Sequence, residues 1–193
     1  MNNVSSLASP NKCSSQDSLL LVIDIQQQLG SAMPGKVLNR VVSNSALLSR
    51  SADLLQIPVF STEQYPRGLG PTVDEIAQAL PESSKSFEKT VFSCSQADGF
   101  SDALTESNRR QVILVGMEAH VCVLQTAMDL RMSEYDVYVV EDAICSRRLE
   151  NYQNALDRLR NSGVHVASAE SVIFEWLVDA RHEHFKAIQK LLR

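Results

Sequence analysis

Apolar residues along this chain are arranged in short continuous runs, separated by longer stretches in which they recur every three or four positions. Short apolar runs are typical of strands that are buried on both faces, as in parallel sheets. Such runs occupy residues 19–25, 57–61, 112–116, 137–140 and 164–167. The pattern therefore predicts a sheet of mostly parallel strands, with other elements between them.

The segments between the runs have the spacing of amphipathic helices, which bury one apolar face against a sheet. Residues 37–55 and 121–132 follow this spacing, as do residues 151–161, where Gly163 is placed to cap the C-terminal end. Alternating strands and helices predict a three-layer α/β/α fold with a doubly wound, mostly parallel, Rossmann-like sheet of about five to six strands. Sites in such folds lie beyond the carboxyl ends of the strands.

The chain length of 193 residues suits one domain, which we expect over residues 18–193. Residues 1–17 are rich in Ser and Asn and lack the features of a secretory signal, so we expect a flexible arm. The arm contains Lys12 and no arginine, which makes it a poor mitochondrial presequence. We expect a cytoplasmic protein, with a mitochondrial location left open. No apolar run approaches the roughly 20 residues that span a membrane, so no membrane partner is expected.

Composition and charge argue against several classes of function. Apolar residues make up 44% and charged residues 21% of the chain, which is ordinary for a globular protein. The formal net charge of −5 offers no basic surface for phosphates, so we expect no nucleic acid partner. The cysteines have neither the paired spacing of a zinc site nor the density of a disulfide framework, which favours a reducing compartment. They are Cys13, Cys94, Cys122 and Cys145.

Two charged residues stand in apolar surroundings, where a charge is costly unless it is paired. Asp24 lies near the end of a predicted strand. Its structural interpretation is a helix cap or an ion pair, and its functional interpretation is a general base or a metal ligand. Lys89 lies between Phe87 and Phe92, where a long cation usually extends to the surface. In an apolar cleft beside a carboxylate it would instead stay charged and stabilise a thiolate or an oxyanion.

Cys122 lies in the first turns of a predicted helix that follows a predicted strand directly through Gly116. Helix N-termini carry partial positive charge and unpaired N–H groups, so we expect a lowered thiol pKa and a candidate nucleophile. The same N–H groups are candidates to bind an oxyanion. The alternative is a small buried apolar residue, which is the usual role of a free cysteine.

The motifs around these residues resemble those of a known superfamily. They are LLLVIDIQQQLG, SFEKTVFS, ILVGMEAHVCVLQTAMDL and YDVYVVEDAICSR, and the likeness runs from about residue 19 to about residue 166. The sequence resembles the isochorismatase-like cysteine hydrolases, which include nicotinamidases. The resemblance implies a triad of Asp24, Lys89 and Cys122, in which the aspartate takes the thiol proton, the thiolate attacks a carbonyl group, and the acyl-enzyme is hydrolysed. It also implies a cis peptide bond at Met117-Glu118 and an oxyanion hole formed by the backbone N–H groups of Glu118 and Cys122.

One segment, STEQYPRGLGPT, departs from the nicotinamidase pattern. Nicotinamidases carry an Asp-x-His pair and a second histidine there, which bind a divalent metal. Glu63 is the single carboxylate of this segment and no imidazole accompanies it, so we expect no catalytic metal and no cofactor. We expect Glu63 to be structural and to bond a backbone N–H group. The loss of the metal weakens the nicotinamide interpretation and leaves the small-molecule substrate open.

Two further groups of residues each have two interpretations. Residues beside the motifs either line the substrate pocket or pack in the core, and they are Gln26, Leu29, Tyr65, Phe92 and His120. The resemblance implies a homo-oligomer, a dimer, tetramer or larger assembly, and apolar positions near the C-terminus serve either its interface or packing within one subunit. They are Ile173, Trp176, Leu177, Phe185, Ile188, Leu191 and Leu192.

Three hypotheses of function follow. The favoured one is a metal-independent cysteine hydrolase that acts on the C–N bond of a small amide, carbamoyl or related carbonyl compound. The second is a catalytically idle binding or assembly module with the same fold. A nuclease, a label that some relatives carry, is the least favoured, because the chain is acidic and a triad built for acyl transfer does not suit phosphodiester cleavage.

Overall fold

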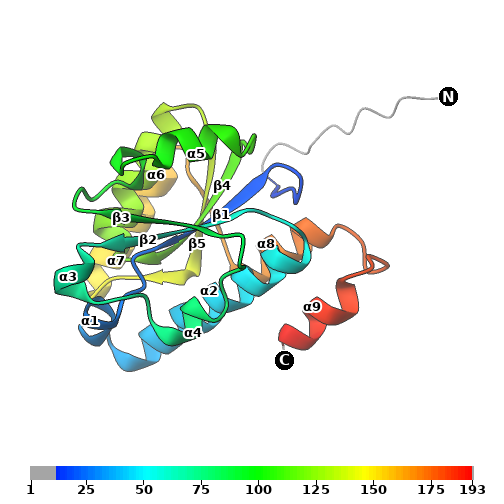
Figure 1. Cartoon of the computed structure of the whole chain (residues 1–193), viewed down its shortest axis with the longest axis horizontal. Coiled ribbons are helices and arrows are strands. Elements are labelled where there is room, and N and C mark those ends of the chain that lie inside the picture. Colours follow the sequence, from blue (N-terminus) through cyan, green and yellow to red (C-terminus); the bar gives the residue numbers. More distant parts are fainter. Residues whose placement is uncertain (1–11, 193) are drawn as a thin grey trace.

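The computed structural model describes residues 12–192 and contains one parallel sheet of six strands (Figure 1). In spatial order the strands are β3, β2, β1, β4, β5 and β6, and each neighbouring pair is parallel. Their bounds are β1 Ser18–Ile23, β2 Val59–Gln64, β3 Lys85–Lys89, β4 Gln111–Met117, β5 Asp136–Cys145 and β6 His165–Ala167. The chain first builds outward from β1 to β3 and then returns to the other side of β1. The point between β1 and β4 is therefore the topological switch point, where such folds form their sites.

Helices cover both faces of the sheet (Figure 1). On one face, apolar side chains of four helices join a common core cluster, and these are α2 Gly35–Leu54, α4 Asp74–Ala77, α8 Ala169–Leu177 and α9 Phe185–Leu191. On the other face lie α5 Phe100–Glu106, α6 Leu124–Met132 and α7 Leu149–Asn161. Shorter elements are α1 Gln27–Ser31, α3 Pro66–Leu69, the 3-10 turn η1 Cys94–Gln96 and the π-helical turn η2 Ala119–Val123. The predicted three-layer, doubly wound α/β fold is confirmed.

The central strand β1 is apolar from Leu19 to Ile23 because both of its faces are covered. Leu20 and Val22 point into the cluster beneath α2 and α8, whereas Leu19, Leu21 and Ile23 point into the cluster beneath α5 and α6. Successive side chains of a strand alternate between the two faces, so a strand covered on both sides needs no polar positions. This explains why the apolar runs of the sequence located the central strands.

β3 is the strand that the apolar pattern missed. Its sequence, KSFEK, lies at one edge of the sheet, where a strand has a neighbour on one side only. Lys85, Ser86 and Glu88 are exposed, and Phe87 is half-buried. An edge strand with exposed side chains needs no continuous apolar run and commonly carries lysine. Its last residue, Lys89, is the buried one.

Gly116 occupies a position where β1 and β4 approach each other closely. It pairs with Ile23, and its φ of 119° is a backbone conformation that residues with a side chain rarely adopt. A Cβ atom added at Gly116 would lie 2.0 Å from the carbonyl oxygen of Ile23. Glycine at this place therefore allows the two strands that frame the switch point to pair.

Replacing Gly116 with alanine is expected to lower the free energy of unfolding by about 3 kcal/mol or more, because the clash is with backbone that cannot rotate away. Urea unfolding followed by the fluorescence of the buried Trp176 measures this change. Gly35→Ala is the matched control, since nothing lies within 4 Å of its added Cβ, and it should change stability by less than about 0.5 kcal/mol. Equal stability of Gly116→Ala and Gly35→Ala would contradict the close approach of Gly116 to the backbone of Ile23.

The segment from Lys12 to Asp17, part of the expected flexible arm, is hydrogen-bonded to the domain, and the flexibility of the arm stays a prediction. The N–H group of Cys13 donates to Glu175 Oε2 at 2.7 Å, and that of Ser14 donates to Gln111 Oε1 at 2.7 Å. The Cys13 side chain is buried in the core. Residues 1–11 of the expected arm lie outside the described residues.

Most of the apolar residues named near the C-terminus pack within the chain, whereas Leu191 is exposed. Ile173, Trp176, Leu177 and Ile188 are buried in the core cluster beneath α2, and Phe185 and Leu192 are half-buried against it. Of the two interpretations, this favours packing within one subunit over an interface, and self-association of the chain stays a prediction. Within residues 12–192, no helix is long and apolar enough to cross a membrane.

Candidate active site

Asp24 lies directly after β1, where the strand ends in a tight turn. Its φ is 51°, a left-handed conformation that aspartate tolerates better than most residues, and its carbonyl oxygen accepts the N–H group of Gln26 at 2.8 Å. The side chain is fully buried, and both carboxylate oxygens are occupied. Thr62 Oγ1 donates to Oδ1 at 2.7 Å, and Lys89 Nζ donates to Oδ2 at 2.7 Å. The Asp24 carboxylate is thus held in one orientation by an ion pair and a hydroxyl group.

Lys89 is buried and paired with Asp24, so of its two interpretations the one at the surface is wrong. Its side chain is 0% exposed, and its ammonium group donates to Asp24 Oδ2 and to Gln64 Oε1, both at 2.7 Å. The carbonyl oxygens of Phe92 and Val91 lie 3.2 and 3.5 Å away. Burial alone lowers the pKa of Lys89, but the Asp24 carboxylate and two nearby cysteines outweigh it, so the net pKa is raised. Lys89 is therefore a permanent cation at neutral pH.

Cys122 lies in the π-helical turn η2, between the end of β4 and the start of α6. It is 5% exposed, and the Asp24 carboxylate lies within reach of its thiol. Burial raises the pKa of the thiol, and the charge and hydrogen bonding of Asp24 raise it further, whereas Lys89 lowers it. The expectation of a lowered pKa is wrong, because burial and the Asp24 carboxylate, which raise the pKa, outweigh the Lys89 cation, which lowers it. The thiol is protonated at rest and lies beside a proton acceptor.

Cys94, in η1, is a second thiol beside the same pair of charges, and no motif identified it. Its N–H group donates to Thr126 Oγ1 on α6 at 2.9 Å, and its thiol donates to Thr62 Oγ1 at 3.8 Å. Cys94 is fully buried, and burial, followed by the charge of Asp24, raises its pKa to about 11. Its thiol lies behind Thr62 rather than at the surface of the site.

Sequence reasoning also missed Thr62 and Gln64, which bind Asp24 and Lys89. The predicted strand stopped at Ser61 because the apolar run ends there, whereas β2 continues to Gln64. Side chains two apart on a strand share a face. A prediction that extended the strand by three residues would have placed Thr62 and Gln64 on one face, pointing into the site.

The family description "Isochorismatase domain" matches residues 18–171, which include all three residues of the implied triad. The chain belongs to the isochorismatase-domain family. It is 39% identical over 186 residues to isochorismatase domain-containing protein 2 of Danio rerio, covering 96% of this chain and 92% of that protein.

Solved structures show the same fold. A Caenorhabditis elegans structure described as MAR1 ribonuclease is 36% identical, with a TM-score of 0.88, covering 94% of this chain and 92% of that one. The Escherichia coli YcaC gene product, described as an octameric hydrolase of unknown specificity, is 22% identical, with a TM-score of 0.81. It covers 95% of this chain and 96% of that one, and this likeness concerns the fold alone. The chain thus has the hydrolase fold of the isochorismatase family.

Glu118 and His120 of this isochorismatase-domain protein hold the loop between β5 and α7. The Met117-Glu118 peptide bond is cis. Glu118 Oε2 accepts the backbone N–H group of Arg147 at 2.9 Å and its Nε at 3.2 Å. His120 Nδ1 lies 2.9 Å from Ser146 Oγ, and its Nε2 lies 3.3 Å from the Asn151 side-chain amide. The side chains of both residues are therefore committed to this loop, and the oxyanion role of the Glu118 and Cys122 N–H groups stays a prediction.

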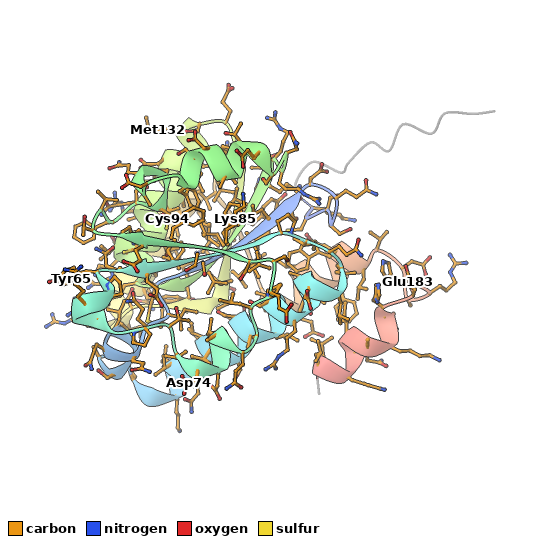
Figure 2. All side chains as sticks on the ribbon, viewed as in Figure 1. Tyr65, Asp74, Lys85, Cys94, Met132 and Glu183 are labelled. Carbon is orange, nitrogen blue, oxygen red and sulfur yellow. The ribbon has the colours of Figure 1, made fainter. Side chains whose placement is uncertain are left out.

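The other residues expected beside the pocket divide into two pairs. Gln26 is fully buried and its side-chain amide is bonded to the backbone of Gln64 and Gly70, whereas Leu29 packs against the core. Tyr65 is 55% exposed at the outer rim beside α3 (Figure 2), where it lines a cleft of about 450 Å³ together with Arg67 and Lys89. Phe92 is 52% exposed, and its carbonyl oxygen binds Lys89. Contact of Tyr65 and Phe92 with a substrate stays a prediction.

Glu63 has the structural role expected of it. Its Oε1 accepts the N–H group of Thr72 at 2.6 Å and the Thr72 hydroxyl at 2.7 Å. Across residues 12–192, no group of three or more His, Cys, Asp or Glu side chains is arranged to hold a metal ion. The absence of a catalytic metal stays a prediction that metal analysis of the purified protein can test.

Proposed function

We propose that this protein is a metal-independent cysteine hydrolase that cleaves the C–N bond of a small amide, carbamoyl or related carbonyl compound. The observation that carries the proposal is the buried ion pair of Asp24 and Lys89 beside the thiol of Cys122. A buried ion pair is costly to desolvate and contributes little net stability compared with apolar packing. Chemistry at the neighbouring thiol is a better explanation for its presence than folding stability.

Asp24 acts as the general base in the first step. It takes the proton of Cys122 Sγ while the sulfur forms a bond to the substrate carbonyl carbon, and the carbonyl electron pair moves onto oxygen. Because the thiol is protonated at rest, proton transfer accompanies the attack. The backbone N–H groups of Glu118 and Cys122 are the proposed donors to the resulting oxyanion. Lys89 stays charged throughout and stabilises the negative charge that passes between carboxylate and sulfur.

The tetrahedral intermediate then collapses. The electron pair returns from oxygen, the C–N bond breaks, and Asp24 gives its proton to the leaving nitrogen, which departs as ammonia or an amine. A thioester remains on Cys122. Water attacks the thioester carbonyl with Asp24 as base, the C–S bond breaks, and the sulfur recovers a proton, which releases the acid and restores the resting site.

The proposal is tested by ammonia release from a panel of small amides, carbamates and ureas. We expect release from at least one class, and background release in the Cys122→Ala variant. Cys145→Ala is the matched control, because Cys145 is another buried thiol that does not face Asp24, and it should retain activity. Mass spectrometry of quenched reactions should find the acyl group on the peptide that contains Cys122. Ammonia release that survives in Cys122→Ala would falsify the proposed nucleophile.

One observation favours a second candidate function. The Caenorhabditis elegans relative is described as a ribonuclease, at 36% identity. The net charge of −5 argues against RNA binding, since phosphate contacts need clustered basic side chains. RNA cleavage that disappears in Cys122→Ala, together with no ammonia release from any amide, would replace the amide proposal with this one. Amide binding without turnover or an acyl adduct would instead indicate an idle binding module.

A further inference from the structure

The orientation of the Gln64 side chain is determined by its two partners. Its Nε2 donates to the carbonyl oxygen of Thr90 at 2.8 Å, and its Oε1 accepts from Lys89 Nζ at 2.7 Å. Rotating the amide by half a turn would set the NH₂ group against an ammonium and the oxygen against a carbonyl, and would lose both bonds. The amide oxygen of Gln64 therefore faces the buried cation.

A second glutamine fixes the backbone of Gln64. Gln26 is fully buried, and its Oε1 accepts the N–H group of Gln64 at 2.8 Å. Its Nε2 donates to the carbonyl oxygen of Gln64 at 3.1 Å and to that of Gly70 at 2.7 Å. Both the backbone and the side chain of Gln64 are thus held in place before any ligand binds.

The surroundings of Lys89 give Gln64 a particular importance. Its ammonium has three N–H groups, and its two shortest contacts are the Asp24 carboxylate and the Gln64 amide oxygen, each at 2.7 Å. The carbonyl contacts to Val91 and Phe92 are longer, at 3.5 and 3.2 Å. Without the amide oxygen, the strongest remaining attraction on the ammonium is the carboxylate alone. Gln64 is therefore the side chain that opposes the pull of Asp24 on Lys89.

We propose that Gln64 is a positioning residue for Lys89, and that its amide oxygen holds the ammonium group where it acts on the thiol of Cys122 as well as on Asp24. The part of this inference that concerns turnover rests on the hydrolase function proposed above. The part that concerns the thiol does not, because Lys89 lowers the pKa of Cys122 whether or not the protein hydrolyses anything. Loss of Gln64 should therefore weaken the field of Lys89 at the sulfur.

The test is the pH dependence of Cys122 alkylation in Gln64→Met, a variant of similar shape that lacks the amide. Iodoacetamide labelling, resolved by peptide mass spectrometry, should follow a profile displaced to higher pH than in the unaltered protein. With a substrate from the amide panel, kcat should fall about tenfold to a hundredfold, the loss expected for one charge-assisted hydrogen bond, with KM nearly unchanged. Gln189→Met on α9 is the control, since Gln189 is exposed and lies on an element distant from the site in sequence.

Two results would overturn the inference. An alkylation profile that coincides with that of the control shows that Gln64 does not position Lys89. A fall in kcat with lowered thermal stability and an unmoved profile shows a merely structural residue. If no amide is hydrolysed, the alkylation profile still decides the matter, so failure of the proposed function and failure of this inference are distinguishable.

Discussion

In Asp24→Asn, turnover and thiol reactivity are expected to change in opposite directions. The variant removes the general base, so kcat/KM for amide hydrolysis should fall by a factor of about 10³ to 10⁴. It also removes the negative charge that, after burial itself, raises the pKa of Cys122, while the lowering influence of Lys89 remains. The thiolate therefore forms at lower pH, and alkylation of Cys122 near pH 8 should become faster than in the unaltered protein.

Asparagine suits this test because it changes the charge and little else. Asp24 has a φ of 51°, a conformation that asparagine adopts readily, so the turn after β1 is retained. The amide oxygen still accepts from Lys89, and the Thr62 hydroxyl can turn to accept from the new NH₂ group. Alkylation and ammonia release are measured on the same preparation, with peptide mapping to separate Cys122 from the other buried thiols. Slower alkylation together with slower turnover would show that Asp24 does not act on the thiol as proposed.

The fold was predictable because the signal for its central strands is strong. Strands such as β1 and β4 are covered on both faces, and burial on both faces requires the continuous apolar runs seen in the sequence. The edge strand β3 carries no such run, and its alternating polar sequence resembles a loop. The sequence therefore located every strand of the sheet except β3, the strand that delivers Lys89.

The candidate site was predictable to a different degree for each residue. Asp24, Lys89 and Cys122 were identified through the motifs of the family, since composition and periodicity alone left each with an ordinary structural interpretation. Thr62 and Gln64 were missed because their hydrogen-bond partners, Asp24 and Lys89, are 38 and 25 residues distant along the chain. The direction of the Cys122 pKa was also wrong, because the position of a helix start is visible in the sequence whereas the burial of a thiol beside a carboxylate is not.

The largest loss of stability is expected for Lys89→Met. This change leaves the Asp24 carboxylate fully buried without its cation, and removing one member of a buried pair typically costs about 3 to 5 kcal/mol. The double variant Asp24→Asn with Lys89→Met removes both charges and should recover a large part of that free energy of unfolding. Urea unfolding measures the free energy of unfolding of both variants, provided that the m-value is unchanged. The non-additivity of the two substitutions gives the interaction free energy between Asp24 and Lys89.

The pH of that measurement follows from the direction of the Lys89 shift. Its pKa is raised in the folded protein, so its stabilising contribution is complete below its ordinary value of 10.5 and declines only as the pH rises through the folded-state value. Between pH 6 and pH 9, the contribution of the Lys89 charge in the unaltered chain should therefore be nearly constant, so a pH within this window suits the measurement. Two results would contradict this account of the buried ion pair. One is a Lys89→Met variant that is as stable as the unaltered protein, and the other is a double variant that is less stable than Lys89→Met.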